Sequence, residues 1–148
     1  MLDEWNANSR GRILVVDDER DIVGWLKHVL THYGFSVTEA YDGVQALEAV
    51  AAEIPDLILL DLKMPRMDGR ATIRRLREQD GTRSVPVIVF TATQLSDEAE
   101  RTQILGMGVK DILHKSVAVE KLIAEVKKYV DGSVAAQRAL TTERSTRS

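Results

Sequence analysis

Short apolar runs alternate with helical patterns along nearly the whole chain, and this alternation restricts the fold more than any other feature. Five runs have the length and composition of buried strands, at residues 12–16, 35–40, 57–60, 85–90 and 109–113. Each run precedes a segment with apolar residues at helical spacing, at residues 20–33, 43–53, 70–79, 96–106 and 118–130. Such strict alternation is typical of a parallel sheet with helices on both faces, so the sequence predicts an α/β fold.

The third apolar run is the most informative, because a carboxylate follows it directly. Residues 57–60 are all apolar, as in a strand buried on both faces, and Asp61 ends the run. Pro65 and the pair Asp68-Gly69 then indicate a turn before the next helix. Asp61 is therefore expected at the carboxyl end of a central parallel strand, where ligands bind in open α/β sheets.

Reactive side chains also follow three other strands at the same edge of the predicted sheet. Right-handed crossovers bring all strand-to-helix turns to one edge, and these turns carry Asp17, Asp18, Asp61, Thr91 and Lys115. Taken singly, the acids and the hydroxyl have an ordinary explanation as helix caps, and the lysine as a solvated charge. Their placement at the ends of four strands favours one common site. None of these turns carries a glycine-rich nucleotide motif.

A site with three carboxylates, a hydroxyl and an ammonium group fits phosphoryl chemistry. Oxygen ligands without histidine or cysteine favour a hard cation, and Mg²⁺ typically takes one or two carboxylates while it keeps several waters. A carboxylate can attack phosphorus to give an aspartyl phosphate. The hydroxyl and the ammonium group can each bind a phosphoryl oxygen. We therefore expect the site to take up phosphate on Asp61 with Mg²⁺ as cofactor.

Composition restricts the class of protein further. The 148 residues are 44% hydrophobic and 29% charged, which is typical of one globular domain. The net charge of −3 offers no basic field for direct nucleic-acid binding, and no apolar run is long enough to span a membrane. The absence of cysteine excludes thiol chemistry and disulfides. These features lead us to expect a cytoplasmic protein that acts through protein contacts.

The chain resembles the receiver domain of bacterial two-component response regulators. The resemblance rests on the acidic pair after the first strand, on Asp61 with Met64-Pro65 and Asp68-Gly69 behind it, on Thr91-Ala92, and on Lys115. It covers residues 11–131 as the receiver domain and leaves a flexible amino-terminal tail at 1–10 and a flexible carboxyl-terminal tail at 132–148. It implies the flavodoxin-like strand order 2-1-3-4-5.

The resemblance also implies roles for the acidic residues. Asp61 is the phosphoacceptor, Asp18 the direct metal ligand, and Asp17 a ligand that acts largely through water. The backbone carbonyl of Lys63 is the third protein ligand of the Mg²⁺ ion. The implied phosphodonor is a histidine kinase or histidine phosphotransfer protein, and the expected oligomeric state is a monomer or weak dimer.

On the phosphate side of the site, the resemblance makes Thr91 the switch hydroxyl, Ala92 the small residue beside the phosphate, and Lys115 the ion-pair partner of the phosphoryl group.

Two positions depart from the family pattern. Ser116 follows the lysine where the family usually has proline after a cis bond, and a cis bond to a non-proline residue costs about 2.5–4 kcal/mol. Ile112 stands where the family usually has an aromatic ring that moves inward, and isoleucine is stiff at χ1. We therefore expect phosphate chemistry with a reduced conformational response.

Residues on the first helix are candidates for docking of the phosphodonor. Ile22 and Trp25 lie towards the active edge, where the family binds the histidine-bearing helices of its partner. A tryptophan at the edge of the core is an equally ordinary explanation. His114, beside Lys115, is expected to be a neutral loop residue.

Three alternatives stay open at this point. The first is an interaction module of the same fold that is not phosphorylated. The second is a Mg²⁺-dependent phosphohydrolase with an aspartate nucleophile, although such enzymes typically carry a second aspartate where this chain has Lys63. The third is an amino-terminal receiver fragment of a longer regulator. We expect a single-domain regulator, because the segment after residue 131 is shorter than the roughly 50 residues of a small domain.

Overall fold

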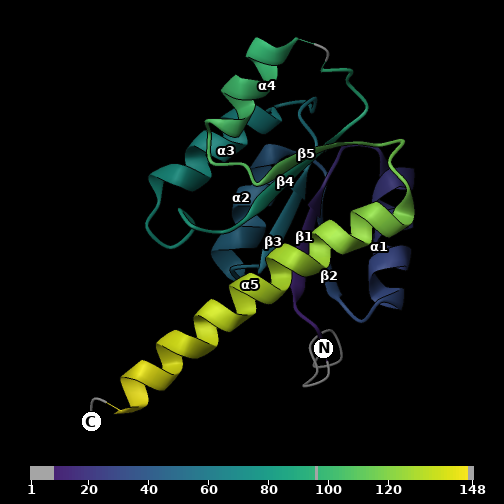
Figure 1. The fold of residues 1–148 in the computed structure, drawn as a ribbon. Coiled ribbons are helices and arrows are strands. Elements are labelled where there is room, and N and C mark those ends of the chain that lie inside the picture. The colour runs from purple at the N-terminus through teal and green to yellow at the C-terminus, as the bar shows by residue number, and fades with distance from the viewer. Residues whose placement is uncertain (1–8, 96, 147–148) are drawn as a thin grey trace.

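The computed structural model describes residues 9–95 and 97–146, which form the predicted parallel sheet with helices on both faces (Figure 1). The strands are β1 (Arg12–Val16), β2 (Ser36–Ala40), β3 (Leu57–Leu60), β4 (Val87–Thr91) and β5 (Asp111–His114). The helices are α1 (Arg20–His32), α2 (Gly43–Ala52), α3 (Gly69–Glu78), α4 (Glu98–Leu105) and α5 (Val119–Thr146). The sheet order is β2-β1-β3-β4-β5, and every pairing is parallel. The fold class and the strand order are confirmed.

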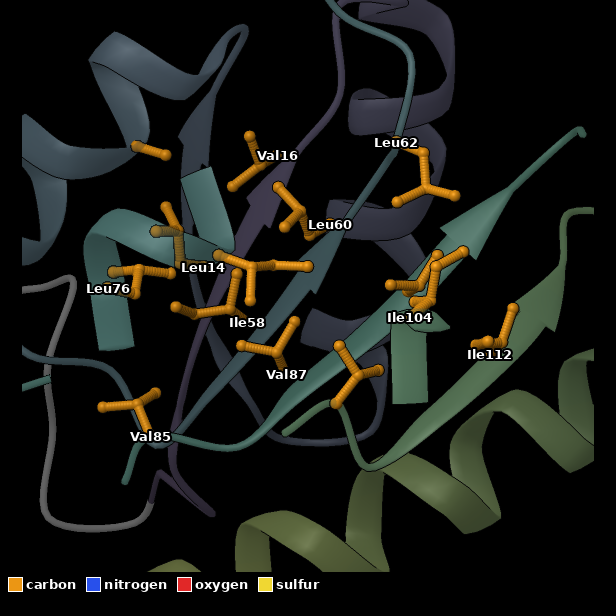
Figure 2. Close-up of a cluster of buried hydrophobic side chains, with 14 of the residues drawn as sticks. Leu14, Val16, Ile58, Leu60, Leu62, Leu76, Val85, Val87, Ile104 and Ile112 are labelled. Atoms are coloured by element: carbon orange, nitrogen blue, oxygen red, sulfur yellow. The ribbon is translucent and has the colours of Figure 1, made fainter. Parts of the chain in front are cut away.

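Two apolar layers, one on each face of the sheet, hold the helices in place. Successive strand residues point to opposite faces, so Ile58 and Leu60 enter the layer under α2, α3 and α4, whereas Leu57 and Leu59 enter the layer under α1 and α5. Figure 2 shows part of the first layer. All four residues of β3 are at most 1% exposed. The prediction of a central strand buried on both faces is therefore confirmed.

The carboxyl end of β4 lies one residue later than predicted, and this shift concerns the site. The predicted strand at 85–90 is in fact Val87–Thr91. Thr91 pairs with the end of β5, because its carbonyl accepts a hydrogen bond from the amide of Lys115 at 2.8 Å. Thr91 is therefore held as a strand residue, with its side chain in a fixed direction.

The sequence Ser96-Asp97-Glu98 is typical of a helix start. Ser96 lies outside the described residues. The side chain of Asp97 accepts from the amide of Ala99 at 2.9 Å and caps α4.

The end of the last helix is the largest difference from prediction. The sequence predicts that this helix ends at residue 130, before the turn-forming pair Asp131-Gly132. This prediction is wrong, because α5 continues to Thr146 and extends past the sheet in Figure 1. A glycine inside a helix costs only about 0.5–1 kcal/mol relative to alanine, so it does not force an end. Residues 132–146 are thus helical, while the domain limits at residues 11 and 131 stay predictions. Residues 1–8 of the predicted amino-terminal tail lie outside the described residues.

Among the described residues, no helix is both long and apolar enough to cross a bilayer.

Candidate functional site

Three carboxylates meet at the carboxyl edge of the sheet, as the sequence predicts. Asp17 and Asp18 follow β1, and Asp61 follows the neighbouring strand β3. The amide of Asp61 donates to the carbonyl of Val16 at 3.0 Å, which keeps the two strand ends in register. One carboxylate oxygen of each residue lies within 4.8 Å of the others. Asp17 and Asp61 are buried, and Asp18 is exposed.

The carboxylate of Asp61 is oriented by contacts to both of its oxygens. Oδ1 accepts a hydrogen bond from the amide of Leu62 at 2.8 Å, and Oδ2 lies 3.4 Å from Nζ of Lys115. Behind this residue, α3 begins in direct contact with the β3–α3 loop, since the amide of Gly69 donates to the carbonyl of Leu62 at 2.9 Å. A Cβ at Gly69 would overlap the carbonyl oxygen of Asp61 and lie 2.8 Å from Cα of Leu62. The close approach therefore requires a residue without a side chain.

The ammonium group of Lys115 lies among three acids. Its Nζ is 2.7 Å from Oδ2 of Asp17, 3.3 Å from Oε1 of Glu19 and 3.4 Å from Oδ2 of Asp61. The lysine side chain is only 10% exposed. Burial by itself lowers the pKa of Lys115, but the hydrogen bond to Asp17 and the charges of Asp61 and Asp17 outweigh burial and raise this pKa. The group therefore stays a cation over the whole physiological range.

The acidic side of the site carries more negative charge than the lysine offsets. Burial raises the pKa of Asp17, and the neighbouring charge of Asp61 raises it further, although the hydrogen bonds from Lys115 and from the amide of Glu19 oppose this shift. A bound cation would remove the repulsion between the carboxylates. The donor atoms are all oxygens, so these residues fit a hard divalent cation.

Thr91 and Lys115 come together on neighbouring strands, also as predicted. Thr91 ends β4 and is 1% exposed, and its hydroxyl accepts a hydrogen bond from the amide of Thr93 at 3.1 Å. Lys115 follows β5, and its amide donates to the Thr91 carbonyl. Ala92 comes directly after β4 and is exposed. The hydroxyl, the small residue and the ammonium group therefore lie at the same sheet edge as the acids.

The two atypical positions are well defined. Ile112 lies in the middle of β5, is 7% exposed, and packs in the layer that contains Ile104 of α4 (Figure 2). The peptide bond between Lys115 and Ser116 is trans. Position 112 thus presents an aliphatic side chain, not an aromatic ring, to the space beside Thr91.

The remaining candidates lie on the surface around the site. Trp25 is 39% exposed and Ile22 is partly buried on α1, which leaves the tryptophan ring accessible. Lys63 is exposed in the β3–α3 loop, two residues after Asp61. The docking role of α1 and the ligand role of the Lys63 carbonyl stay predictions.

Sequence reasoning missed two contacts in this site. Glu19 reaches Lys115, and its position directly after the acidic pair was the available signal. His114 was expected to be a loop residue, but it ends β5 and contacts Ala92 and Ser116. Its place next to Lys115 was the only hint in the sequence.

Comparison with known proteins gives a consistent family. A family model described as "Response regulator receiver domain" matches residues 13–127. The chain is 40% identical to the response regulator MprA of Mycobacterium avium over 116 residues, which are 78% of this chain and 49% of that protein. For MprA of Mycobacterium tuberculosis the identity is 42% over 117 residues, with the same two shares. The chain thus spans about half the length of the curated relatives it matches.

Solved structures agree with this result. The signal receiver domain of a signal transduction histidine kinase from Syntrophus aciditrophicus has a TM-score of 0.75 and 34% identity, over 82% of this chain and 91% of that one. The BeF3-activated receiver domain of Klebsiella pneumoniae RstA has a TM-score of 0.73 and 27% identity, over 80% of this chain and 97% of that one. Since the family model matches most of the chain and the acidic residues lie where the strand ends place them, this chain belongs to the response regulator receiver domain family.

Proposed function

We propose that Asp61 accepts a phosphoryl group from a histidine kinase or a histidine phosphotransfer protein. The observation that carries the proposal is the arrangement around Asp61: a buried carboxylate with one oxygen anchored by the amide of Leu62 and the other facing the ammonium group of Lys115. Receiver domains as a family accept phosphoryl groups from histidine kinases. We extend this family property to the present chain as a proposal.

The chemical step is a transfer between two nucleophiles. A carboxylate oxygen of Asp61 attacks phosphorus, the phosphorus–nitrogen bond of the donor phosphohistidine breaks, and its electron pair stays on the imidazole nitrogen. Lys115 and the hydroxyl of Thr91 bind phosphoryl oxygens after transfer. Hydrolysis of the aspartyl phosphate by water later restores the carboxylate.

Mg²⁺ is the cation that we propose for the acidic cluster. Asp17, Asp18, Asp61 and the carbonyl of Lys63 would hold it, with Asp17 acting largely through water. When bound, it would offset the negative charge of the transferred phosphoryl group. Burial raises the pKa of Asp17, and a cation of any kind beside this carboxylate would offset the cost of keeping it ionised.

The output of phosphorylation is proposed to be a change in protein contacts. A related receiver domain, that of Klebsiella pneumoniae RstA, is described as BeF3-activated, which supports a role for the phosphate site in activation. In this chain, Ile112 is buried and branched, and we expect it to stay packed in both states. The change should then be confined to the loops after β4 and β5 and to α4. We propose protein partners, because a net charge of −3 offers no basic field for nucleic acid, and a cytoplasmic location.

Phosphate labelling tests the proposal directly. The wild type, Asp61→Asn and Asp56→Asn are incubated with acetyl phosphate and Mg²⁺. Asp56 is a matched control, because it lies at the opposite end of β3 and keeps an acceptor for the amide of Arg12 after the change to asparagine. We expect one label on the wild type and on Asp56→Asn, and none on Asp61→Asn.

The other outcomes separate the alternatives. A wild type that takes no label, but binds a partner protein through the same edge, would be an interaction module. Multiple turnover of small phosphate esters would indicate a phosphohydrolase. Persistent labelling of Asp61→Asn would place the acceptor elsewhere.

A further inference from the structure

The imidazole of His114 connects the two loops that frame the phosphate side of the site. Its Nε2 lies 3.0 Å from the carbonyl oxygen of Ala92 in the β4–α4 loop. Its Nδ1 lies 2.7 Å from Oγ of Ser116 and 3.1 Å from the amide nitrogen of Ser116 in the β5–α5 loop. The last sheet hydrogen bond between β4 and β5 runs from the Lys115 amide to the Thr91 carbonyl. Beyond it, the ring of His114 bridges the β4–α4 loop and the β5–α5 loop.

The partners of the ring fix its tautomer. The carbonyl of Ala92 can only accept, so Nε2 must carry the proton. The amide of Ser116 can only donate, so Nδ1 must offer its lone pair, and the Ser116 hydroxyl can donate to the same atom. This is the neutral Nε2–H tautomer.

The bridge begins and ends beside the two groups that bind phosphate. Ala92 is adjacent to Thr91, whose hydroxyl is held by the Thr93 amide. At the other end of the bridge, Ser116 is adjacent to Lys115. A displacement of Thr91 towards a phosphoryl oxygen that carries its backbone along would also move the Ala92 carbonyl, and with it the hydrogen-bonded ring.

There is open space for such a displacement. A cavity of about 250 Å³ lies next to the bridge, and its lining includes Thr91, Arg101 of α4, Ile112 and His114. Ile112 is the position at which the family pattern has an aromatic ring. The side chain of Ile112 borders this volume without filling it.

We propose that His114 is the positioning residue that couples Thr91 to the β5–α5 loop, in place of the missing ring at position 112. The inference rests on the proposed function, since Thr91 must respond to a phosphoryl group on Asp61. His114 touches neither the phosphoryl group nor the metal; it acts through the Ala92 carbonyl and the Ser116 amide. The hydrogen bonds of the ring link the two loops directly, so a movement of one loop can be passed to the other.

Nuclear magnetic resonance of the full chain with beryllofluoride and Mg²⁺ tests the coupling. In the wild type, we expect the amide resonances of Ala92 and Ser116 to shift together, and the side-chain nitrogen resonances of His114 to report the Nε2–H tautomer before addition. His114→Phe keeps a ring but removes both nitrogens. It should retain the shift at Ala92 and lose most of the shift at Ser116. Ser116→Ala keeps the amide donor and should retain the coupled response.

The outcomes distinguish this inference from the function on which it rests. If beryllofluoride shifts no resonance near Asp61 in the wild type, the proposed function fails and the coupling fails with it. If resonances near Asp61 shift and the Ser116 response is the same in His114→Phe as in the wild type, only the role of His114 is overturned. A wild-type ring in the Nδ1–H tautomer would also overturn it, independently of whether any variant folds.

Discussion

Replacing Gly69 by alanine should damage both the stability of the fold and the chemistry of Asp61. The added Cβ would overlap the carbonyl oxygen of Asp61 and lie 2.8 Å from Cα of Leu62 and 3.1 Å from the carbonyl carbon of Asp61. These are backbone atoms, so no side chain can rotate out of the way. The amino-terminal end of α3 and the β3–α3 loop must move apart instead.

The size of the effect follows from this geometry. Overpacking of this kind typically costs about 1–3 kcal/mol in the free energy of unfolding. The displaced segment carries the phosphoacceptor, and a misplacement of about 1 Å at a reacting group can cost roughly 10²-fold in rate. We expect the rate of phosphorylation by acetyl phosphate to fall by about that factor. Urea unfolding and timed phosphate labelling measure the two effects on the same protein.

Gly24→Ala is the matched control for this variant. Gly24 lies inside α1 and is exposed, and a Cβ added there would meet no atom of another segment within 4 Å. Alanine should therefore stabilise the protein by about 0.4–1 kcal/mol and leave labelling by acetyl phosphate unchanged, since this small donor needs no docking on α1. If Gly69→Ala matches Gly24→Ala in both assays, the argument that α3 packs directly against the phosphoacceptor loop is wrong.

Three further changes have defined outcomes. Asp18→Ala should reduce Mg²⁺ affinity measured by calorimetry, and an unchanged affinity would contradict the metal assignment. Arg77→Met should lower the free energy of unfolding in urea by about 1–3 kcal/mol. The reason is that the guanidinium of Arg77 donates to the carbonyls of two separate loops, at residues 82–85 and 107–108. The control, Arg74→Met, lies at an exposed position of the same helix and should change stability by less than about 0.5 kcal/mol. For Asp42, burial opposes ionisation, but a backbone amide of α2 and Arg66 outweigh it and hold the pKa below its ordinary value. The ionised Asp42 therefore stabilises the fold above the unfolded-state pKa of about 4, and this stabilisation is lost as the pH falls through the lower folded-state pKa. The free energy of unfolding of Asp42→Asn should lack this part of the pH dependence. If the wild type and Asp42→Asn show the same dependence of unfolding free energy on pH, the assignment is wrong.

Local sequence patterns predicted the features of this fold that depend on periodicity. The four apolar residues of β3 indicated a strand that is buried on both faces, and Asp61 directly after it could be placed at the sheet edge. The carboxylates of Asp17 and Asp18 could then be brought to the same edge by the topology alone. These predictions required no knowledge of side-chain contacts.

Features that depend on tertiary contacts were not predictable in the same way. Asp131-Gly132 has the composition of a helix stop, yet α5 continues through it. The helix propensity of glycine is lower than that of alanine by only about 1 kcal/mol, so a single glycine does not end a helix. The bridge from His114 to Ala92 joins residues that are 22 positions apart, and no spacing rule indicates it. The approach of Glu19 to Lys115 spans 96 positions and depends equally on the folded sheet.

Direct location of the phosphorylated residue is the measurement that tests the central claim most closely. The protein is phosphorylated with acetyl phosphate and Mg²⁺ and reduced with borohydride, which converts an aspartyl phosphate to homoserine, and its peptides are then sequenced by mass spectrometry. The account predicts that homoserine replaces Asp61 and no other aspartate. Modification of Asp17 or Asp18, or full labelling without any change at Asp61, would contradict it.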